Sequence, residues 1–584
     1  MVSWLKELNT FEKVVLSLIF IGFLLYANSF ANEMFWDDDD GILNNQYIRS
    51  WEYFPKYFSE NLIAGAGLLS NYWRPMILTI FSIEWHLWQD WVLGYHFINT
   101  SLHIADAILL FFILFYIFKR KKLSFITALI FLIHPLQTEA VTYISGIGDS
   151  LSVFFIFSGI LFYLKFRKSG EIYFKNKFYF LSLLMYVFAL LSKETAFVMP
   201  GFVFLADFFF LQRIRKTSLK ERLKEIVKSI WPFFVLAGVY LLLRATTLNF
   251  VNTFNLYNEE NLFTSNIYFR VLTFFKILTV YFGLLFWPLN LHMKRSVEIA
   301  TSFGSFPVVL GAVLFFGLMT LAFLNFKKLP VVSFGILWFF VGIALTSNVL
   351  VPINGLLYEH WMYLPMIGIF LALIWFCMKV SENRVFLKKC FGLMLIIFLI
   401  FLGILTVKRN TDWRSPITFY EQTLKYAPES YRIVNNLCMA YNNAGYYGKA
   451  EETCKKAIGL EPSGPVAYHN LANTYRSTGR TELAEEGFLK AIELDPKFIF
   501  SYNALTSLYL ERGEYGKARE ILERVLDYTG SKINVLLSLS QIAFEEEDLD
   551  ASLDYLERAE EIRPEDKNIK ESIENIKNLI RSKE

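Results

Sequence analysis

The sequence predicts an all-α protein in two parts, a polytopic membrane helix bundle followed by a solenoid of helix pairs. Hydrophobic residues make up 54% of the 584 residues and charged residues only 19%, which is typical of a chain that crosses a membrane many times. The charge is divided unevenly. Residues 412–584 contain 22 Lys and Arg against 30 Asp and Glu, a net charge of −8. Because the whole chain has a net charge of +3, the preceding residues have a net charge of +11. A basic membrane part therefore precedes an acidic, water-soluble part.

The membrane part is defined by apolar runs, each of which would need roughly 20 residues to cross the hydrocarbon layer. Some runs are shorter, as helices inside a packed bundle can be. We expect helices near residues 14–31, 94–118, 123–135, 149–166, 178–191, 196–211, 229–247, 271–289, 305–325, 330–350, 361–378 and 390–407.

Basic loops predict the orientation of these helices. Because Lys and Arg accumulate on the cytoplasmic side of membrane proteins, we place the basic loops there. These loops are residues 119–122, 165–177, 212–228, 327–328 and 379–389.

One apolar run does not fit a simple alternation. Three runs lie between the 212–228 loop and Lys327, whereas two cytoplasmic loops require an even number of crossings. The run at 271–289 contains Lys276, so we interpret it as a re-entrant or interfacial helix. About eleven spans then remain, with a cytoplasmic N-terminus and exoplasmic C-terminal part. Such a protein would lie in a bacterial or archaeal plasma membrane, or in the endoplasmic reticulum membrane with its C-terminal part in the lumen.

The soluble part has a period of 34 residues. Pro428, Pro462 and Pro496 are each 34 residues apart, and Pro564 follows after twice that distance. This period is typical of tetratricopeptide repeats. We expect a membrane domain at 1–410, a linking half repeat at 411–429, four repeats at 430–565 and a capping helix at 566–584. The second repeat has the expected packing residues Tyr468, Leu471, Ala472, Tyr475, Gly479, Ala484, Phe488 and Ala491.

Polar side chains recur on the first helices of the repeats and should share one surface. Their amides both donate and accept hydrogen bonds, which suits an extended peptide backbone. The alternative is that they join neighbouring repeats. The residues are Asn435, Asn436, His469, Asn470 and Asn503.

Two cysteines lie in the same part, Cys438 and Cys454, sixteen residues apart. They are either buried thiols or a disulfide between paired helices, and a disulfide requires an oxidising compartment.

Four adjacent carboxylates, Asp37 to Asp40, follow the first apolar run. A site there, at the membrane surface, could be reached sideways by a lipid-bound substrate. We assign Asp37 as a general base that takes the proton of a substrate hydroxyl, with Asp38 orienting that hydroxyl or sharing the charge. Asp39 and Asp40 are solvated loop residues or ligands of a divalent cation, Mg or Mn. No firm cofactor follows from the sequence.

Other loops on the predicted exoplasmic side add ionisable groups, which are costly beside a membrane and therefore often functional. We assign Arg74, Lys193, His360 and Tyr363 to the phosphate or lipid of a donor, Arg through a bidentate contact. Each group alone could instead anchor a helix end or be a satisfied core residue. Further candidates for a substrate cavity are His96, Asn99, His103, His134, Glu139, Asp149, Glu194 and Glu359.

Several short motifs occur in a characteristic order. Phe35, Asp37, Asp38, Gly41, Ile42 and Asn45 follow a pattern similar to F-x-D-D-x-x-A-I-x-x-N. Arg74–Pro75, His96/Asn99/His103, His134–Val141, Ser192–Glu194 and Tyr363–Pro365 come after it. Over essentially its whole length the chain resembles the transmembrane-and-tetratricopeptide (TMTC-type) proteins of the GT-C glycosyltransferase superfamily, and thus protein O-mannosyltransferases.

The resemblance implies a GT-C type bundle that moves a sugar, mannose or another hexose, from a polyprenyl or dolichyl phosphate carrier to Ser or Thr of a protein. The expected partners are that lipid-linked sugar, a protein or peptide acceptor and membrane lipids, and no nucleic acid. Two alternatives are a lipid-linked oligosaccharide ligase or polymerase, and a non-catalytic membrane scaffold whose repeats bind peptides.

Overall fold

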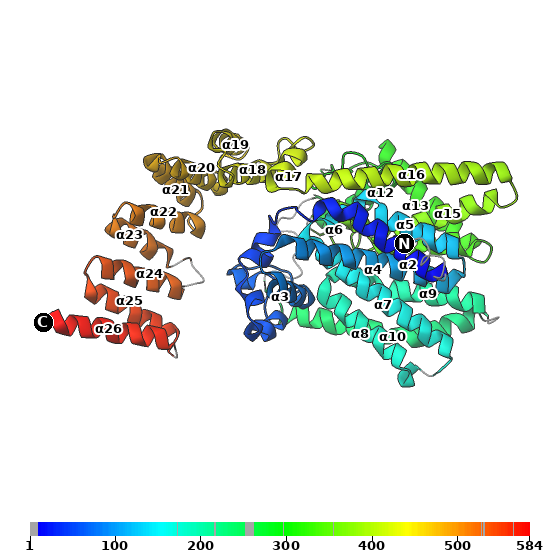
Figure 1. The fold of residues 1–584 in the computed structure, drawn as a ribbon, viewed down its shortest axis with the longest axis horizontal. Coiled ribbons are helices and arrows are strands. Elements are labelled where there is room, and N and C mark those ends of the chain that lie inside the picture. Colours follow the sequence, from blue (N-terminus) through cyan, green and yellow to red (C-terminus); the bar gives the residue numbers. More distant parts are fainter. Residues whose placement is uncertain are drawn as a thin grey trace, which may run out of the picture. The chain divides into compact units, whose positions relative to one another are not determined.

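The computed structural model describes residues 10–171, 173–214, 218–250, 262–295, 297–353, 355–526, 528, 532–564 and 566–583. These residues form helices, turns and loops without a β-strand. The chain divides into two compact units, Met1–Phe419 and Tyr420–Glu584 (Figure 1), here called the membrane unit and the repeat unit. The all-α class predicted from the sequence is thereby confirmed.

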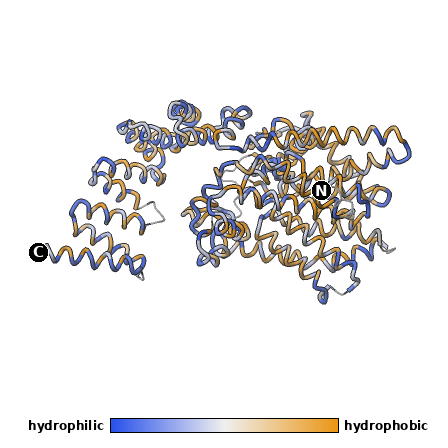
Figure 2. Tube along the Cα trace, in the orientation of Figure 1, coloured by the Kyte–Doolittle hydropathy of each residue, from blue (hydrophilic) through white to orange (hydrophobic). Residues whose placement is uncertain are grey.

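Helices of the membrane unit are strongly apolar, as the hydropathy colouring shows (Figure 2). In the described part of the chain, eight helical segments are long and apolar enough to cross a membrane. They contain α2 (Thr10–Tyr26), α4 (Val92–Phe118), α7 (Ile147–Ser169), α9 (Met199–Ile214), α10 (Leu219–Ala245), α12 (Ile267–Phe286), α13 (Phe306–Asn325) and α16 (Val385–Asp412). Shorter apolar helices are α8 (Lys177–Ser192), α14 (Pro330–Ile343) and α15 (Met366–Ser381).

One further apolar segment is bent by 55°, between α5 (Lys121–Ile133) and the short helices of Pro135–Val141. The bend has a local cause. His134 is extended, with φ −75° and ψ 130°, because a residue before proline avoids the α-helical region and Pro135 has no N–H to continue the helix. The His134 ring accepts the backbone N–H of Leu136 over 3.2 Å and caps the next turn. Helix α5 thus ends at residue 133, and the chain turns there.

Helix α12 contains the run that the sequence predicted to be re-entrant or interfacial. Leu285, near its C-terminal end, accepts a hydrogen bond from His134 over 3.0 Å. Arg270, near its N-terminal end, donates to Leu350 in the loop after α14 over 3.3 Å. Both contacts join α12 to loops, and α12 is long enough to cross a membrane, so the number of crossings stays a prediction.

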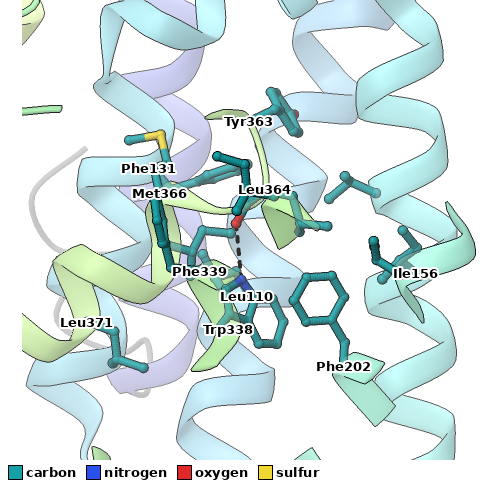
Figure 3. Close-up of a cluster of buried hydrophobic side chains, with 14 of the residues drawn as sticks. Leu110, Phe131, Ile156, Phe202, Trp338, Phe339, Tyr363, Leu364, Met366 and Leu371 are labelled. Atoms are coloured by element: carbon teal, nitrogen blue, oxygen red, sulfur yellow. Dashed lines mark hydrogen bonds between the residues drawn. The ribbon is translucent and has the colours of Figure 1, made fainter. Parts of the chain in front are cut away.

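The core of the membrane unit is closely packed around Trp338 (Figure 3). The Trp338 ring lies 4.1 Å from the Phe202 ring, and its indole N–H donates to the Leu364 carbonyl over 3.0 Å. Helices α14 and α15 meet at Gly335 and Gly368, where a Cβ on Gly335 would lie 2.3 Å from the Gly368 carbonyl oxygen. Because Leu364 directly follows the loop of residues 359–363, the core fixes the position of that loop.

The repeat unit consists of successive helix pairs. They are α18 (Tyr431–Asn443) with α19 (Tyr447–Leu460), α20 (Pro465–Ser477) with α21 (Thr481–Leu494), α22 (Ile499–Glu511) with α23 (Tyr515–Val525), and α24 (Lys532–Glu545) with α25 (Leu549–Ile562). Helix α26 (Lys567–Lys583) follows and buries Ile569, Ile573 and Ile576. A disulfide joins Cys438 of α18 to Cys454 of α19. Gly530, at the 34-residue step between Pro496 and Pro564, lies outside the described residues.

Candidate active site

The carboxylate loop, residues 35–40, is held by its second aspartate. Asp38 is buried, with 1% of its surface exposed. Its carboxylate accepts hydrogen bonds from the Ser145 backbone N–H over 2.8 Å and the Ser145 hydroxyl over 2.5 Å, and from the Phe35 N–H over 3.2 Å. Three donors to one buried carboxylate fix the loop against the segment that contains Ser145.

Asp37, the predicted base, is exposed. Its backbone N–H donates to the Tyr143 hydroxyl over 3.1 Å, and its carboxylate also interacts with that hydroxyl, so Tyr143 ties this residue down. The preceding residue, Trp36, has φ 65°, a left-handed conformation that non-glycine residues seldom adopt. Such strained positions persist where surrounding contacts enforce them, and they are enriched at functional sites. The loop therefore presents Asp37 at the surface from a fixed backbone.

The pKa values of the other three carboxylates are all raised. Burial raises the pKa of Asp38 to about 7, although the hydrogen bonds from Ser145 and Phe35 oppose the shift. Burial, together with repulsion from Asp40 and Asp37, raises the pKa of Asp39 to about 6. Burial and the charge of Asp37 also raise the pKa of Asp40.

A divalent cation would need several oxygen ligands. Among the described residues, no three His, Cys, Asp or Glu side chains converge as metal ligands.

Residues 134–149 connect the separate parts of the site, because side chains and backbone of this one segment reach four other loops or helices. The segment begins at the bend after α5 and ends in the first turn of α7. It places Tyr143 and Ser145 against the carboxylate loop, His134 against Leu285, Glu139 against His360, and Asp149 against Lys193.

Arg74, Lys193 and His360, predicted to hold a donor phosphate, are each paired with a carboxylate. Arg74 contacts Glu194 over 2.8 Å and also lies 4.3 Å above the Tyr72 ring. Lys193 contacts Asp149 over 2.7 Å. A phosphate would have to displace or share these carboxylate partners.

His360 forms the third pair. Its ring Nδ1 lies 2.8 Å from a Glu139 carboxylate oxygen, and its backbone N–H donates to the other oxygen over 3.0 Å. Together with Asp149, Thr195 and Tyr363, His360 lines a small cavity of about 30 Å³, roughly the volume of one water molecule. The cavity brings together three predicted site residues from two segments, Asp149 of α7 and both His360 and Tyr363 of the 359–363 loop.

The predicted polar residues of α4 form hydrogen bonds inside the bundle. His96 contacts the Asn32 carbonyl over 3.1 Å, and Asn99 donates to the Tyr143 and Ile144 carbonyls. His103 lies 2.7 Å from the Tyr363 hydroxyl, which donates to the buried Asp106 over 2.8 Å. These contacts position α4 and the loops above it, and the hydroxyl of Tyr363 points to this buried group.

Glu359 is buried between two arginines that the sequence analysis did not select. It contacts Arg409 over 3.3 Å and Arg295 over 3.8 Å, and accepts the backbone N–H of His292 over 2.7 Å. Burial raises the pKa of Glu359, and Arg409 opposes the shift. The sequence offered one sign of Arg409, a basic residue in the last turn of an apolar helix. No local sequence pattern identifies Ser145 or Tyr143 as site residues.

In the repeat unit, part of the predicted polar surface joins neighbouring repeats. Asn470 donates to the Asn435 side chain over 3.0 Å, and both residues are buried. Asn436 approaches the Tyr420 hydroxyl at 3.5 Å, and His469 contacts Ser501 at 3.0 Å. Asn503 is exposed.

A polar pocket of about 560 Å³ lies on the first helices of three successive repeats. Asn443, Ser477 and Glu511 occupy equivalent positions 34 residues apart, so the lining follows the repeat period. The Arg476 guanidinium is paired with Glu511, which leaves carboxamides as the main hydrogen-bonding groups. The lining consists of Met439, Asn442, Asn443, His469, Asn470, Asn473, Arg476, Ser477 and Glu511.

Sequence comparisons connect both units to known proteins. The chain is 22% identical over 461 residues to the protein O-mannosyl-transferase F38B6.6 of Caenorhabditis elegans, covering 77% of this chain and 63% of that protein. It is 24% identical over 467 residues to the mouse (Mus musculus) protein O-mannosyl-transferase TMTC3, covering 75% and 50%. The chain is similar to TMTC proteins along most of its length. The human (Homo sapiens) protein O-mannosyl-transferase TMTC4 is 22% identical, covering 71% and 62%.

This chain spans between half and just under two thirds of the length of these TMTC relatives. The resemblance predicted from the motifs is confirmed at this level. A family model described as tetratricopeptide repeat matches residues 431–463, 465–498 and 533–566, and a second such model matches residues 488–520.

Similar solved structures include the crystal structure of MamA, with 24% identity and a TM-score of 0.23, covering 25% of this chain and 85% of that one. A thermophilic tetratricopeptide repeat protein of Thermus thermophilus has 20% identity and a TM-score of 0.22, covering 27% and 88%.

Proposed function

We propose that the chain is an integral-membrane glycosyltransferase. It moves a hexose, mannose in the first instance, from a polyprenyl or dolichyl phosphate to Ser or Thr hydroxyls of protein acceptors. The observation that carries the proposal is the exposed Asp37 on a loop that the buried Asp38 fixes against Ser145. Similarity to protein O-mannosyl-transferases supports the reaction class.

Asp37 acts as the general base. Its carboxylate takes the proton of the acceptor hydroxyl while the hydroxyl oxygen attacks the anomeric carbon of the sugar. The bond from that carbon to the phosphate oxygen breaks, and the polyprenyl phosphate leaves with the electron pair. Base and leaving group lie on opposite faces of the sugar in such an inverting transfer. Asp38 is a positioning residue, because its carboxylate is already occupied by three donors.

The donor phosphate binds by exchanging with carboxylates that already neutralise the cations. Arg74, Lys193 and His360 each hold one carboxylate at 2.7–2.8 Å, and the three pairs include Glu194, Asp149 and Glu139. A phosphate offers the same oxygen ligands, and a guanidinium binds it in a bidentate manner. The resting ion pairs keep partly buried charges compensated until the donor arrives.

Acceptor binding falls to the repeat unit. Its polar pocket offers both donors and acceptors for an extended main chain, and it has no excess of either charge because Arg476 is paired. We expect Asn442, Asn443 and Asn473 to make the main contacts.

The site and the repeats face the exoplasmic side. Basic loops at 119–122, 212–228 and 379–389 support this orientation. The Cys438–Cys454 disulfide supports it independently, since structural disulfides persist in oxidising compartments.

The deciding experiment measures sugar transfer and donor-lipid binding in the same preparations of the full chain. Asp37→Asn keeps the size but removes the proton acceptor, so transfer should fall by about 10²–10⁴ while donor binding is retained. Asp90→Asn, in an exposed loop of the membrane unit, is the matched control and should transfer normally. Near-normal transfer by Asp37→Asn and Asp38→Asn would refute the proposal and favour the ligase or scaffold hypothesis.

A further inference from the structure

The C-terminal end of α16 is built into the candidate site. Trp413, directly after this helix, is 1% exposed, and its ring stacks on the Tyr143 ring with centroids 5.2 Å apart and planes 21° apart. It also lies 6.3 Å from the Phe35 ring and 4.4 Å from the Phe419 ring. Trp413 thus contacts both the residue that binds the Asp37 N–H and the residue that binds the Asp38 carboxylate.

Asn410, one turn earlier, makes a second set of contacts, with the 134–149 segment and with residues that precede the carboxylate loop. Its side-chain oxygen accepts the Thr142 hydroxyl over 2.7 Å. Its amide group donates to the Asn28 side chain over 2.8 Å and to the Leu25 carbonyl over 3.0 Å. The backbone carbonyl of Asn410 accepts the Asn32 side chain over 3.0 Å. The end of α16 is therefore hydrogen-bonded both to residues 25–32, which precede the carboxylate loop, and to the 134–149 segment.

We propose that Trp413 is a positioning residue for sugar transfer, acting through Tyr143 on the backbone of Asp37. The inference rests on that proposed function. A tyrosine hydroxyl can fix a backbone N–H only while its ring is held in one plane, and Trp413 covers the face of the Tyr143 ring. Small displacements matter here, because about 1 Å of misplacement of a catalytic group can cost on the order of 10² in rate.

The indole N–H of Trp413 makes no hydrogen bond to the described residues. The site therefore uses the Trp413 ring itself, which stacks on Tyr143 and also lies 5.7 Å from the Arg409 guanidinium. Phenylalanine should replace it well and an aliphatic side chain should not, which separates positioning from simple filling of volume. Trp375 in α15 is a matched control, because it is also buried and its indole N–H also has no partner among the described residues.

The test compares Trp413→Leu, Trp413→Phe and Trp375→Leu in the full-length protein. We expect Trp413→Leu to lower kcat by about 10- to 100-fold with little change in the KM for the donor, and Trp413→Phe to restore most of kcat. Trp375→Leu should lower the melting temperature by a similar amount and leave kcat of the folded protein unchanged. Equal loss of kcat in both Leu variants, or a failure of Trp413→Phe to rescue it, would overturn the inference.

Hydrogen exchange provides a readout that does not depend on activity. The Asp37 amide should lose protection in Trp413→Leu and keep it in Trp375→Leu, whatever the sugar donor. If Trp413→Leu does not fold, Thr142→Val removes the link to Asn410 at nearly constant volume and should deprotect the same amide. An absence of transferase activity in the wild-type protein would contradict only the proposed function. Unchanged protection of the Asp37 amide in Trp413→Leu would contradict the role of Trp413.

Discussion

The buried carboxylate of Asp38 accepts hydrogen bonds from both the backbone N–H and the hydroxyl of Ser145, over 2.8 and 2.5 Å. The two residues are 107 positions apart, and their contact joins the carboxylate loop to the segment that carries Glu139 and Asp149. Removing the hydroxyl with Ser145→Ala leaves the backbone donor in place. It should loosen the loop and reduce sugar transfer by about 10-fold, less than Asp37→Asn does. Ser150→Ala, which removes a hydroxyl bonded only locally to Ile147, should have no such effect.

Asp38 also makes stability depend on pH. Its pKa is about 7 in the folded protein and near 3.8 when unfolded, so the folded state binds more protons between these values. The free energy of unfolding therefore falls as the pH rises from about 4 to 7, by up to about 4 kcal/mol from this group. Asp38→Asn removes this loss. Its melting temperature should exceed that of the wild type increasingly as the pH rises from about 5 to about 8, and a difference independent of pH would contradict the assignment.

Variants of Arg74 and Glu194 test whether Arg74 binds the donor phosphate or only forms a structural ion pair. If Arg74 grips the donor phosphate, Arg74→Ala weakens binding of the donor lipid, because the bidentate contact is lost. Glu194→Gln should maintain or strengthen donor binding, since the carboxylate no longer competes for the guanidinium. Equal weakening in both variants, measured as donor-lipid affinity in detergent, would mean that the ion pair only holds the loops together.

The orientation can be read from the reactivity of single cysteines. With Cys377 and Cys390 replaced, Glu482→Cys in α21 should react with a membrane-impermeant reagent added from the exoplasmic side, since this side chain is exposed. Lys220→Cys, in the first turn of α10 within the basic 212–228 segment, should react only after the membrane is opened. The opposite pattern would place Asp37 in the cytoplasm and reject the catalytic assignment.

The repeat pocket should govern acceptor choice rather than chemistry. Asn473→Ala and Asn443→Ala remove carboxamides from its lining, so transfer to a protein acceptor should fall several-fold while transfer to a short peptide at high concentration is kept. Asn503→Ala, exposed and outside the pocket lining, is the matched control. Equal losses on both kinds of acceptor would contradict a role in acceptor binding.

Loss of the Cys438–Cys454 disulfide should destabilise the first repeat. A bridge that closes a loop of this length contributes about 3 kcal/mol in the chain-entropy model. Reduction, or replacement of both cysteines by alanine, should lower the melting temperature of the repeat unit and weaken acceptor binding, because α18 carries Met439, Asn442 and Asn443 of the pocket. Reduction should not change the donor affinity of the membrane unit.

The sequence by itself determined the class of the fold, because apolar length and a 34-residue period are local properties. It marked the membrane helices, the repeats and the carboxylates at the membrane edge. The break before Pro135 was also within reach, since the conformational limits of proline and its neighbour act within about two residues.

Only the tertiary structure decided how those groups are used. Asp37 and Asp38 are adjacent and chemically identical, yet one is exposed and the other is buried under Ser145, a partner far away in the chain. Arg74, Lys193 and His360 were expected to await a phosphate, but each meets a carboxylate on another loop. Trp413 reaches Tyr143 only because the end of α16 packs beside the 134–149 segment. Burial and ion pairing depend on which distant segments pack together, and no local pattern encodes that.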